Sequence, residues 1–360
     1  MERRLFLKGA ALAGAGATLA APAIAQERKT MVIVSTWPRD FPGVGTSAQR
    51  LAERITALTE GRITTEYYAA GERVGAFDSF DEVASGNSQA YIAADYYWAG
   101  KHPSWPYFCT VPFGFSYNEM NAWIKFRGGQ ELWDELGGQF GIKSLHCGTT
   151  GTQAGGWFNR ELNSVDDLKG LKMRIPGLGG QVMAKLGVST ISLPGGQIYE
   201  NLVSGSIDAA DWIGPWNDYF LKLYEAAKFY YTSGFQEPGA NISMGFNAAW
   251  WGSLTDWEKR ALTAAVTEEL SIGMDEGTSN NGVYLRKLVD EHGVQLRAYS
   301  DDTWDGFGDA AMEVFDETRQ HSDIAERIHA SFEENLRDLG DYTKNFETNV
   351  INQRNRVFDI

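Results

Sequence analysis

Two successive series of short apolar segments, each alternating with amphipathic or helical segments, constrain the fold of this chain more than any other feature. In the first series, residues 30–37 and 90–94 have the pattern of buried strands, and residues 63–68 alternate like a half-buried strand. Residues 47–59 carry apolar side chains at helical spacing, and residues 78–85 predict a short helix. Strands that alternate with helices in this way indicate an α/β lobe with a mainly parallel sheet.

The pattern starts again near the middle of the chain, with strands expected at 143–147, 171–175 and 207–212 and helices at 180–186 and 198–204. A strand at 241–246 is expected to return to the first lobe. The rest is predicted to be helical, over 255–276, 281–291, 301–321 and 324–339. Two α/β lobes that the chain enters more than once predict a hinged clamshell with a helical C-terminal part. Its ligand would lie in the cleft, where strand ends converge.

The lobe boundaries follow from these patterns. The first lobe is expected to comprise residues 26–148 with about 237–275. The second lobe would contain 149–236 with part of 276–322, and a helical extension would occupy 323–360.

The first 25 residues have the pattern of a cleaved leader. Arg3-Arg4 precede a weakly apolar stretch rich in glycine and alanine, which closes with Ala23-Ile24-Ala25. The arginine pair predicts a twin-arginine signal peptide over residues 1–25, export to the periplasm and a mature chain that starts near Gln26. A membrane-anchoring helix is the alternative, but the stretch is short and poor in leucine, isoleucine and valine.

Charge and motifs exclude several classes of function. The formal net charge of -15 argues against nucleic acid as the main partner. A mean hydropathy of -0.32 argues against a membrane-embedded protein. The chain contains no phosphate-binding loop, no zinc-protease motif and no G-x-S-x-G, and its five histidines lack metal-ligand spacing. Cys109 and Cys147 could form one disulfide or remain two buried thiols.

Three segments could together form a site for a carboxylate. Arg174 ends a predicted strand and could present two parallel N–H donors to a carboxylate, although a surface arginine paired with an aspartate is the alternative. Asp211 and Trp212 leave another strand, where a carboxylate could help to hold a hard cation. Gln153 lies in the glycine-rich segment 148–156, which would let the backbone approach a ligand closely.

Residues 95–98, Asp-Tyr-Tyr-Trp, follow a predicted strand and could supply an aromatic wall. An aromatic core cluster is the alternative for this segment. The sequence leaves open which aromatic side chains line the ligand pocket; the candidates are Trp37, Phe77, Trp98, Trp216 and Phe246.

The leader and three internal segments together resemble a known family. The segments are 148–157, the run Asp-Leu-Lys-Gly-Leu-Lys-Met-Arg at 167–174, and Gly205 to Pro215. They are similar to the solute-binding subunits of TRAP transporters (tripartite ATP-independent periplasmic transporters), which are clamshell periplasmic binding proteins. The segment around Asp211, with Tyr96-Tyr97-Trp98, resembles the branch that binds 2-oxo or 2-hydroxy monocarboxylates through a metal ion.

This resemblance implies a role for particular residues. Arg174 would clamp the ligand carboxylate, and Gln153, Asp211 and Trp212 would hold a Ca²⁺ or Na⁺ ion, Trp212 through its backbone carbonyl. The residues implied to contact the substrate are Arg174, Gln153, Tyr96, Tyr97, Trp98, Thr149, Trp212, Phe246 and Asn247. Two positions depart from the branch: Asp211 stands where glutamate is frequent, and Thr149 stands where asparagine is common.

The resemblance implies binding with hinge closure and no catalysis. The closed protein would deliver a carboxylate such as pyruvate or lactate to the TRAP membrane permease, and residues 341–360 could pack on a second copy as a homodimer. Two other functions remain open from the residues. A periplasmic lyase or hydrolase would need a general base, for which Asp211 is the only candidate. A sensory binding protein would use the same clamshell.

Overall fold

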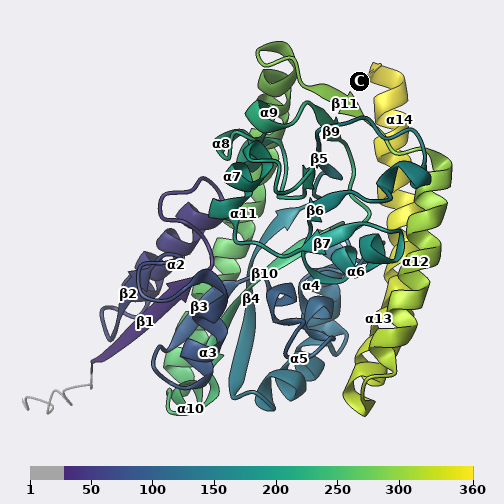
Figure 1. Cartoon of the computed structure of the whole chain (residues 1–360). Helices are drawn as coiled ribbons and strands as arrows, with labels where there is room; N and C mark the ends of the chain where they lie inside the picture. The colour runs from purple at the N-terminus through teal and green to yellow at the C-terminus, as the bar shows by residue number, and fades with distance from the viewer. Residues whose placement is uncertain (1–27, 360) are drawn as a thin grey trace, which may run out of the picture.

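The structure, a computed structural model, describes residues 28–359 and contains two mixed β-sheets surrounded by helices (Figure 1). The predicted signal peptide over residues 1–25 lies outside the described residues. The first sheet has the strand order β2-β1-β3-β10-β4. Its strands are β1 (Lys29–Ser35), β2 (Ile63–Tyr68), β3 (Ala90–Ala93), β4 (Ile142–Gly151) and β10 (Ala240–Asn247).

Both parallel and antiparallel pairs make up the first sheet. β1 pairs in parallel with β2 and β3, as the alternation of strands and helices predicts. β10 is antiparallel to both β3 and β4, so the expectation of a mainly parallel sheet is wrong for this half of the sheet. The strand expected at 143–147, where the pattern starts again, corresponds to β4, which pairs with β10 and forms the edge of the first sheet. A strand pattern does not reveal its partner, because pairing depends on segments far apart in the chain.

The second sheet is built from short strands in the order β11-β9-β5-β8-β6-β7. They are β5 (Gly156–Phe158), β6 (Lys172–Arg174), β7 (Ser189–Ile191), β8 (Ala209–Ala210), β9 (Phe229–Tyr231) and β11 (Gln295–Arg297). β6 is parallel to β7 and β8, whereas β5 is antiparallel to β8 and β9. Sequence reasoning missed β5, β7, β9 and β11, because strands of three residues are too short to show a period.

Helices cover the sheets and link them. The α-helices are α2 (Val44–Leu58), α3 (Ser79–Ala84), α4 (Tyr117–Phe126), α5 (Gly129–Gly138), α6 (Gly177–Lys185), α7 (Ile198–Val203), α8 (Pro215–Phe220), α9 (Leu223–Ala226), α10 (Ala248–Gly252), α11 (Asp256–Asp290), α12 (Asp301–Arg319), α13 (Asp323–Tyr342) and α14 (Asn349–Phe358). Short 3₁₀ helices are η1 (Ala76–Asp78), η2 (Asp95–Trp98), η3 (Trp105–Phe108), η4 (Val165–Leu168) and η5 (Gly195–Gln197), and η6 (Thr343–Thr348) is a π-helical segment.

The long helix α11 contacts elements of both halves of the molecule. A capping box of Thr255 and Glu258 starts it, and it packs on β4, α2 and α8. The sequence predicted two helices here, with a break before residue 281. The structure has one continuous helix, because packing on three elements outweighs the weak helix propensity of the polar, glycine-containing segment near Gly277. Buried Glu269 ties α11 to α2 through ion pairs of 2.6 Å to Arg50 and to Arg54.

Two short segments cross between the sheets and lie side by side, while α10 and α11 make a third crossing from β10 to β11. One joins β4 to β5 over residues 152–155, and the other joins β9 to β10 over residues 232–239. The backbone N–H of Gln153 donates to the carbonyl of Glu237 at 3.0 Å, and Gly234 N–H donates to the carbonyl of Gln153 at 3.0 Å. These crossover segments therefore form a narrow connection between the two sheets.

The C-terminal helices lie along one side of the molecule, drawn in yellow-green and yellow in Figure 1. α12 packs on α6 and α13, and α13 packs on α4 and α5, so this layer contacts elements next to both sheets. No helix within residues 28–359 combines the length and apolarity that a membrane span requires. Cys109 and Cys147 are both buried as free thiols, which answers the question that the sequence left open.

Candidate functional site

Arg174 is the centre of the candidate site. It is the last residue of β6 and has no exposed surface. Its Nε donates to the carbonyl of Leu193 at 3.1 Å, and its Nη1 donates to the carbonyl of Asp211 at 2.6 Å. Its Nη2 makes one long contact, 3.5 Å to the hydroxyl of Tyr97. One edge of the guanidinium is therefore held by the protein, and the other keeps N–H groups for a further acceptor.

Asp211 and Trp212 leave β8 directly beside this arginine. The backbone N–H of Asp211 donates to the carbonyl of Arg174 at 2.9 Å, which continues the pairing of β6 and β8. Asp211 Oδ2 lies 3.4 Å from Arg174 Nη1, and Oδ1 accepts a hydrogen bond of 2.9 Å from Gln236 Nε2. The Arg174 guanidinium also lies 5.4 Å from the ring of Trp212. The structure thus brings these three predicted residues together.

The two crossover segments bring further oxygen atoms to this place. Gln153 comes from the first crossover, and Gln236 and Glu237 come from the second; each side chain is at most 2 % exposed. Within the described residues, three of their buried side-chain oxygens have no hydrogen-bond partner: Gln153 Oε1, Gln236 Oε1 and Glu237 Oε2. Buried acceptors without partners are costly and uncommon, so they indicate that a donor or a cation belongs there.

The electrostatics of the site point in the same direction. Burial raises the pKa of Glu237 well above its usual range, and the neighbouring carboxylate of Asp211 raises it further. Burial also raises the pKa of Asp211, against the opposing effect of the Arg174 charge. Two buried carboxyls therefore share the single positive charge of Arg174, and a bound cation would stabilise their ionised forms.

The donor set is suited to a hard cation. It combines two carboxylates with amide oxygens and backbone carbonyls, which are the ligands that Ca²⁺ and Na⁺ prefer over nitrogen or sulfur. Within the described chain, no cluster of three histidine, cysteine, aspartate or glutamate side chains could hold a metal ion. A site here would therefore depend on the amide and carbonyl oxygens as well as on the two acids.

Glu237 was missed by sequence reasoning. It lies in the run Gln236-Glu237-Pro238-Gly239, which reads as an ordinary polar turn before a strand. The only available signal is that a strongly apolar strand, β10, follows the turn directly, so that the turn lies close to the core. The burial of Glu237 arises from the second crossover, which no local pattern shows.

Aromatic side chains from both halves of the molecule enclose Arg174. The ring of Tyr97 lies 4.5 Å from that of Phe77 and 6.1 Å from that of Trp37. Trp212 faces Trp37 at 6.1 Å and Phe41 at 6.0 Å. The indole N–H groups of Trp37 and Trp212 are buried without an acceptor among the described residues. Because buried tryptophan N–H groups usually have acceptors, these two groups are available to donate hydrogen bonds to a polar ligand.

Tyr96 lies at the edge of this wall. Its ring meets that of Tyr97 at 4.7 Å, and its phenol is close enough to Arg174 and Glu237 for their charges to act on its pKa, which burial raises well above the usual range. Tyr96 and Tyr97 are therefore brought to the site, as the resemblance implies.

Three other expected residues lie elsewhere. Trp98 points into the core of the first sheet, where its ring packs on Phe80 at 5.2 Å and on Tyr91 at 5.5 Å. Phe246 and Asn247 end β10, whereas the start of that strand adjoins the site. Asn247 caps α10 by accepting a hydrogen bond from Trp250 N–H. The contacts of these three residues are therefore with the core and with α10, and the structure does not bring them together with Arg174.

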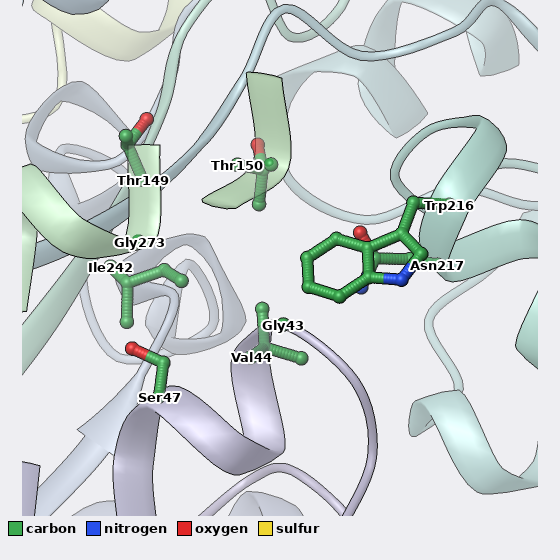
Figure 2. A pocket seen from close by; sticks show the side chains of 10 residues that line it. Gly43, Val44, Ser47, Thr149, Thr150, Trp216, Asn217, Ile242 and Gly273 are labelled. Carbon is green, nitrogen blue, oxygen red and sulfur yellow. The ribbon is translucent and has the colours of Figure 1, made fainter. Parts of the chain in front are cut away.

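Thr149 is one of the residues that line a neighbouring cavity of about 20 Å³, which is large enough for one water molecule (Figure 2). Its hydroxyl donates to the carbonyl of Ala240 at 2.8 Å, so it supports the backbone next to the site. In Figure 2, Trp216 and Asn217 of α8 face Gly43 and Val44 at the start of α2. Asn217 Nδ2 donates to the carbonyl of Pro42 at 2.6 Å, a direct bond between elements beside different sheets.

With this geometry established, comparison with known proteins identifies the family. Residues 33–321 match the family described as bacterial extracellular solute-binding protein, family 7. The match covers most of the chain, and the chain belongs to this family of TRAP-transporter solute-binding proteins, whose members serve transport and are not enzymes.

Individual relatives agree with this assignment. A curated protein of Nostoc sp., described as a monocarboxylate 2-oxoacid-binding periplasmic protein, is 36 % identical over 328 residues, which cover 88 % of this chain and 89 % of the relative. A TRAP solute-binding protein of Pseudoalteromonas atlantica, solved with sodium and pyruvate, is 33 % identical with a TM-score of 0.88, covering 91 % of this chain and 99 % of that one.

A third relative adds a different ligand. The TRAP solute-binding protein of Bordetella bronchiseptica is described as a mixed-occupancy dimer with copurified calcium and picolinate. It is 28 % identical with a TM-score of 0.90, covering 92 % of this chain and 99 % of that one. The predicted two-lobe α/β fold of periplasmic binding proteins is confirmed by these matches.

Proposed function

We propose that this protein binds a small 2-oxo or 2-hydroxy monocarboxylate together with a Ca²⁺ or Na⁺ ion in the periplasm and delivers it to the membrane permease of a TRAP transporter. One observation carries the proposal: the wholly buried Arg174 guanidinium keeps a free Nη2 edge and feels the charge of buried Glu237, whose segment bonds to that of Gln153, and both residues have buried side-chain oxygens without partners. Such a place offers fixed positive charge for a carboxylate and oxygen ligands for a hard cation.

The roles of the residues follow from the contacts. The Nη2 edge of Arg174 would bind one ligand carboxylate oxygen, and the hydroxyl of Tyr97 would lie next to it. Gln153 Oε1, Glu237 Oε2, the Asp211 carboxylate and the Trp212 carbonyl would hold the cation, which would polarise a carboxylate oxygen and the 2-oxygen of the ligand. The unpartnered indole N–H groups of Trp37 and Trp212 could donate to the same oxygens. Together, these groups favour a compact anion with two adjacent oxygen functions over a simple carboxylate.

Two lobes would open and close around this site. We place one lobe on the first sheet and one on the second, with the crossover segments 152–155 and 232–239 as the hinge. Gln153 and Glu237 lie on the hinge itself, Tyr97 and Trp37 on the first lobe, and Arg174 and Trp212 on the second. A ligand that contacts all of them is bound fully only in the closed form, so binding favours closure.

Thermal unfolding of the mature protein against a panel of ligands tests the proposal. Pyruvate, lactate and longer 2-oxoacids should stabilise the protein, by about 2.7 kcal/mol at 100 times the Kd, which raises the Tm by a few degrees. Acetate should not, because it lacks the second chelating oxygen. Loss of the effect with a chelator identifies Ca²⁺, and loss in sodium-free buffer identifies Na⁺.

Arg174→Lys is the decisive variant, because lysine keeps the charge but not the planar pair of donors. It should weaken pyruvate binding by about 10-fold or more, equivalent to about 1.4 kcal/mol or more. Arg160→Lys is the matched control, since Arg160 is an exposed arginine in the loop after β5 that bonds to the Asp167 carbonyl, and it should bind like the wild type. Stabilisation by sugars or amines alone, or equally by acetate and pyruvate, would contradict the proposal.

A homodimer is part of the same proposal. An apolar stripe on the C-terminal helix is solvent-exposed in the single chain, with Phe346 64 %, Val350 64 % and Val357 64 % exposed. Exposed apolar surface of this kind marks interaction sites, and the Bordetella relative is described as a dimer. We expect a second copy of this chain to cover the stripe.

The dimer is tested by light scattering of the purified protein during gel filtration. The wild type should elute as a dimer at micromolar concentration, and Phe346→Ser with Val350→Ser should elute as a monomer. Met312→Ser is the control, because Met312 is 58 % exposed on α12, outside the stripe. A monomeric wild type, or an unchanged dimer in the double variant, would show that the stripe is not the interface.

Export by the twin-arginine pathway is the remaining part. The Arg3-Arg4 pair supports it, and so does membership of a family described as extracellular solute-binding proteins. Replacing both arginines by lysine should leave the precursor in the cytoplasm, as measured by cell fractionation. Export of that variant at the wild-type level would favour the general secretory route.

A further inference from the structure

The loop that carries two of the proposed cation ligands is held from behind by a buried carboxylate. Asp218 lies on α8, just after the loop, and is 1 % exposed. Its Oδ1 accepts two hydrogen bonds from the loop backbone, from the N–H of Ile213 and from the N–H of Gly214, each at 3.1 Å. The side chain therefore forms a short hydrogen-bonded turn with the backbone of residues 213–218.

The other carboxylate oxygen of Asp218 connects this turn to the second sheet through two hydrogen bonds. Oδ2 accepts from Trp157 Nε1 at 2.8 Å and from the hydroxyl of Tyr230 at 2.9 Å. Trp157 lies on β5 and Tyr230 on β9, and their rings stack at 4.1 Å between centroids. All four donors are neutral, so Asp218 has no ion-pair partner among the groups that bind it. Its hydrogen bonds connect the loop to two strands.

We propose that Asp218 is a positioning residue that orients the Trp212 carbonyl toward the cation; this inference rests on the cation site of the proposed function. The Ile213 N–H and the Trp212 carbonyl belong to one planar trans peptide unit, so they point in opposite directions. When Asp218 binds the N–H on one side of the unit, the carbonyl is fixed on the other side. The same anchor limits the movement of Asp211, one residue further back.

The loop is also held by the hinge, which leaves this peptide unit little freedom. The N–H of Ala154, next to Gln153, donates to the carbonyl of Ile213 at 3.0 Å. Asp218 thus binds the N–H of the peptide unit between Trp212 and Ile213. In the following peptide unit, between Ile213 and Gly214, Asp218 binds the Gly214 N–H and the Ala154 N–H binds the Ile213 carbonyl. Because the Trp212 carbonyl is already held in place, the loop loses less conformational entropy when the ion binds.

A direct charge effect is the competing explanation, because a buried carboxylate near the site would attract a cation without touching the loop. Two substitutions separate these explanations. Asp218→Asn removes the charge but keeps a side-chain oxygen at the same distance for the two N–H groups. Asp218→Glu keeps the charge but moves the carboxylate by one methylene in a packed interior, so it displaces the loop.

The experiment measures Tb³⁺ binding to the full mature chain through emission excited by tryptophan, with Ca²⁺ as the competitor. Tb³⁺ takes oxygen ligands as Ca²⁺ does, and its emission lifetimes in H₂O and D₂O report how many water molecules it binds. Asp218→Glu should weaken Ca²⁺ binding at least 10-fold and add about one bound water, because the carbonyl ligand is lost. Asp218→Asn should stay within threefold of the wild type with the same water count.

A control separates positioning from general destabilisation. Tyr230→Phe removes only a donor to Oδ2 and leaves both loop hydrogen bonds, so it should lower the Tm while Ca²⁺ affinity stays within threefold of the wild type. Pyruvate affinity at saturating Ca²⁺ should also stay within threefold in Asp218→Asn, because Arg174 is untouched.

The outcomes are distinguishable. If Asp218→Asn loses Ca²⁺ as strongly as Asp218→Glu, or if Asp218→Glu binds Ca²⁺ with an unchanged water count, the positioning role is overturned. If Asp218→Glu fails to fold, Asp218→Asn still tests the positioning role. Wild-type Ca²⁺ affinity with the wild-type number of bound waters supports the role, and a weaker affinity or a changed number of waters overturns it. If the wild type itself binds neither Tb³⁺ nor Ca²⁺, the proposed calcium site fails, and the role of Asp218 toward it fails with it.

Discussion

Glu237 is in a position that an acidic side chain rarely occupies without compensation. It is 2 % exposed, one of its oxygens is unpartnered among the described residues, and the charges of Asp211 and Arg174 act on its pKa in opposite directions. Burying a charge in this way is unfavourable unless a partner or an ion compensates it. Glu237 is therefore expected to reduce the stability of the ligand-free protein and to favour cation binding, because a bound cation compensates its buried charge.

Glu237→Gln should weaken Ca²⁺ binding about 10- to 100-fold, because a neutral amide oxygen replaces an anionic ligand. The metal-free variant should be at least as stable as the wild type, since the repulsion with Asp211 is gone. Calorimetric titration with Ca²⁺ and thermal unfolding measure the two effects. The matched control is Glu200→Gln on α7, an exposed glutamate; equal Ca²⁺ affinity of the two variants would remove Glu237 from the site.

Asp95 gives a prediction about pH. It is fully buried and accepts hydrogen bonds from Tyr91, Ser243 and Trp133, and burial raises its pKa to about 7. The unfolded chain releases this proton near pH 4, so between about pH 4 and 7 the folded state binds more protons than the unfolded state. The contribution of Asp95 to stability is therefore retained at low pH and decreases as pH rises toward 7.

Asp95→Asn should remove this dependence. The amide can replace the protonated carboxyl, because the hydroxyls of Tyr91 and Ser243 can accept as well as donate. Relative to the wild type, the variant should be more stable at pH 8, by roughly 2–4 kcal/mol, and nearly equal at pH 4.5. Thermal unfolding at both pH values checks this, and a difference that does not change with pH would contradict it.

The residues of the site differ in how far the sequence could predict them. Arg174, Asp211 and Trp212 follow strands, and their chemistry shows in the local pattern, so they were predicted and lie together. Gln153 is in a recognisable glycine-rich segment. Glu237 and Asp218 could not be found in this way, because only the packing of the crossover and of α8 separates them from ordinary surface acids.

At the scale of elements, the short helix η5 shows how closely the site is packed. A Cβ atom on Gly195 would lie 2.2 Å from the ring of Trp212, whereas a Cβ on Gly196 would meet no atom within 4 Å. η5 therefore needs glycine at position 195 because the Trp212 ring lies against its backbone. These two adjacent glycines form a natural pair of test and control.

Gly195→Ala should displace the Trp212 ring, weaken pyruvate binding by about 10-fold and lower the Tm, since overpacking typically costs about 1–3 kcal/mol. Gly196→Ala should leave both unchanged, and the conformational effect of the added methyl group on the unfolded chain can even raise stability slightly. Binding titrations and thermal unfolding compare the pair. Similar results for both alanines would show that the packing around Trp212 relaxes freely.

The elements of the fold were predictable where they are long and regular. β1, α2, β2 and α12 match their patterns within a few residues, because their apolar faces repeat over several positions. The short strands of the second sheet carry too few residues for a period. The continuity of α11 could not be predicted either, since it depends on α2, β4 and α8 packing along a segment that contains glycine and asparagine.

At the scale of the whole molecule, the bond between Asn217 and Pro42 connects the two proposed lobes. It joins α8, which follows the cation loop, to the segment before α2. Gly43, at φ +80, accommodates this contact, since a side chain there would meet Asn217 Nδ2 at 2.6 Å. Because this contact requires the two proposed lobes to lie close together, we expect it to stabilise the proposed closed form.

Asn217→Ala should shift the protein toward the open form and weaken pyruvate binding about 3- to 10-fold, as expected for the loss of one hydrogen bond of about 1 kcal/mol. Small-angle X-ray scattering without ligand should show a larger radius of gyration than for the wild type. The control is Asn280→Ala, whose side chain bonds only within α11 and its neighbour Ser279. Unchanged affinity and size in Asn217→Ala would exclude a role in closure.

The complete burial of Arg174 also has a consequence for timing. In the proposed hinge mechanism, a carboxylate bound to this wholly buried guanidinium would leave only when the two lobes separate. The residence time of every ligand is then at least the waiting time for that separation, however weakly the ligand itself is held. Chemically different 2-oxoacids would share one upper limit on their dissociation rate, and a permease that pulls the lobes apart would release them all at the same pace.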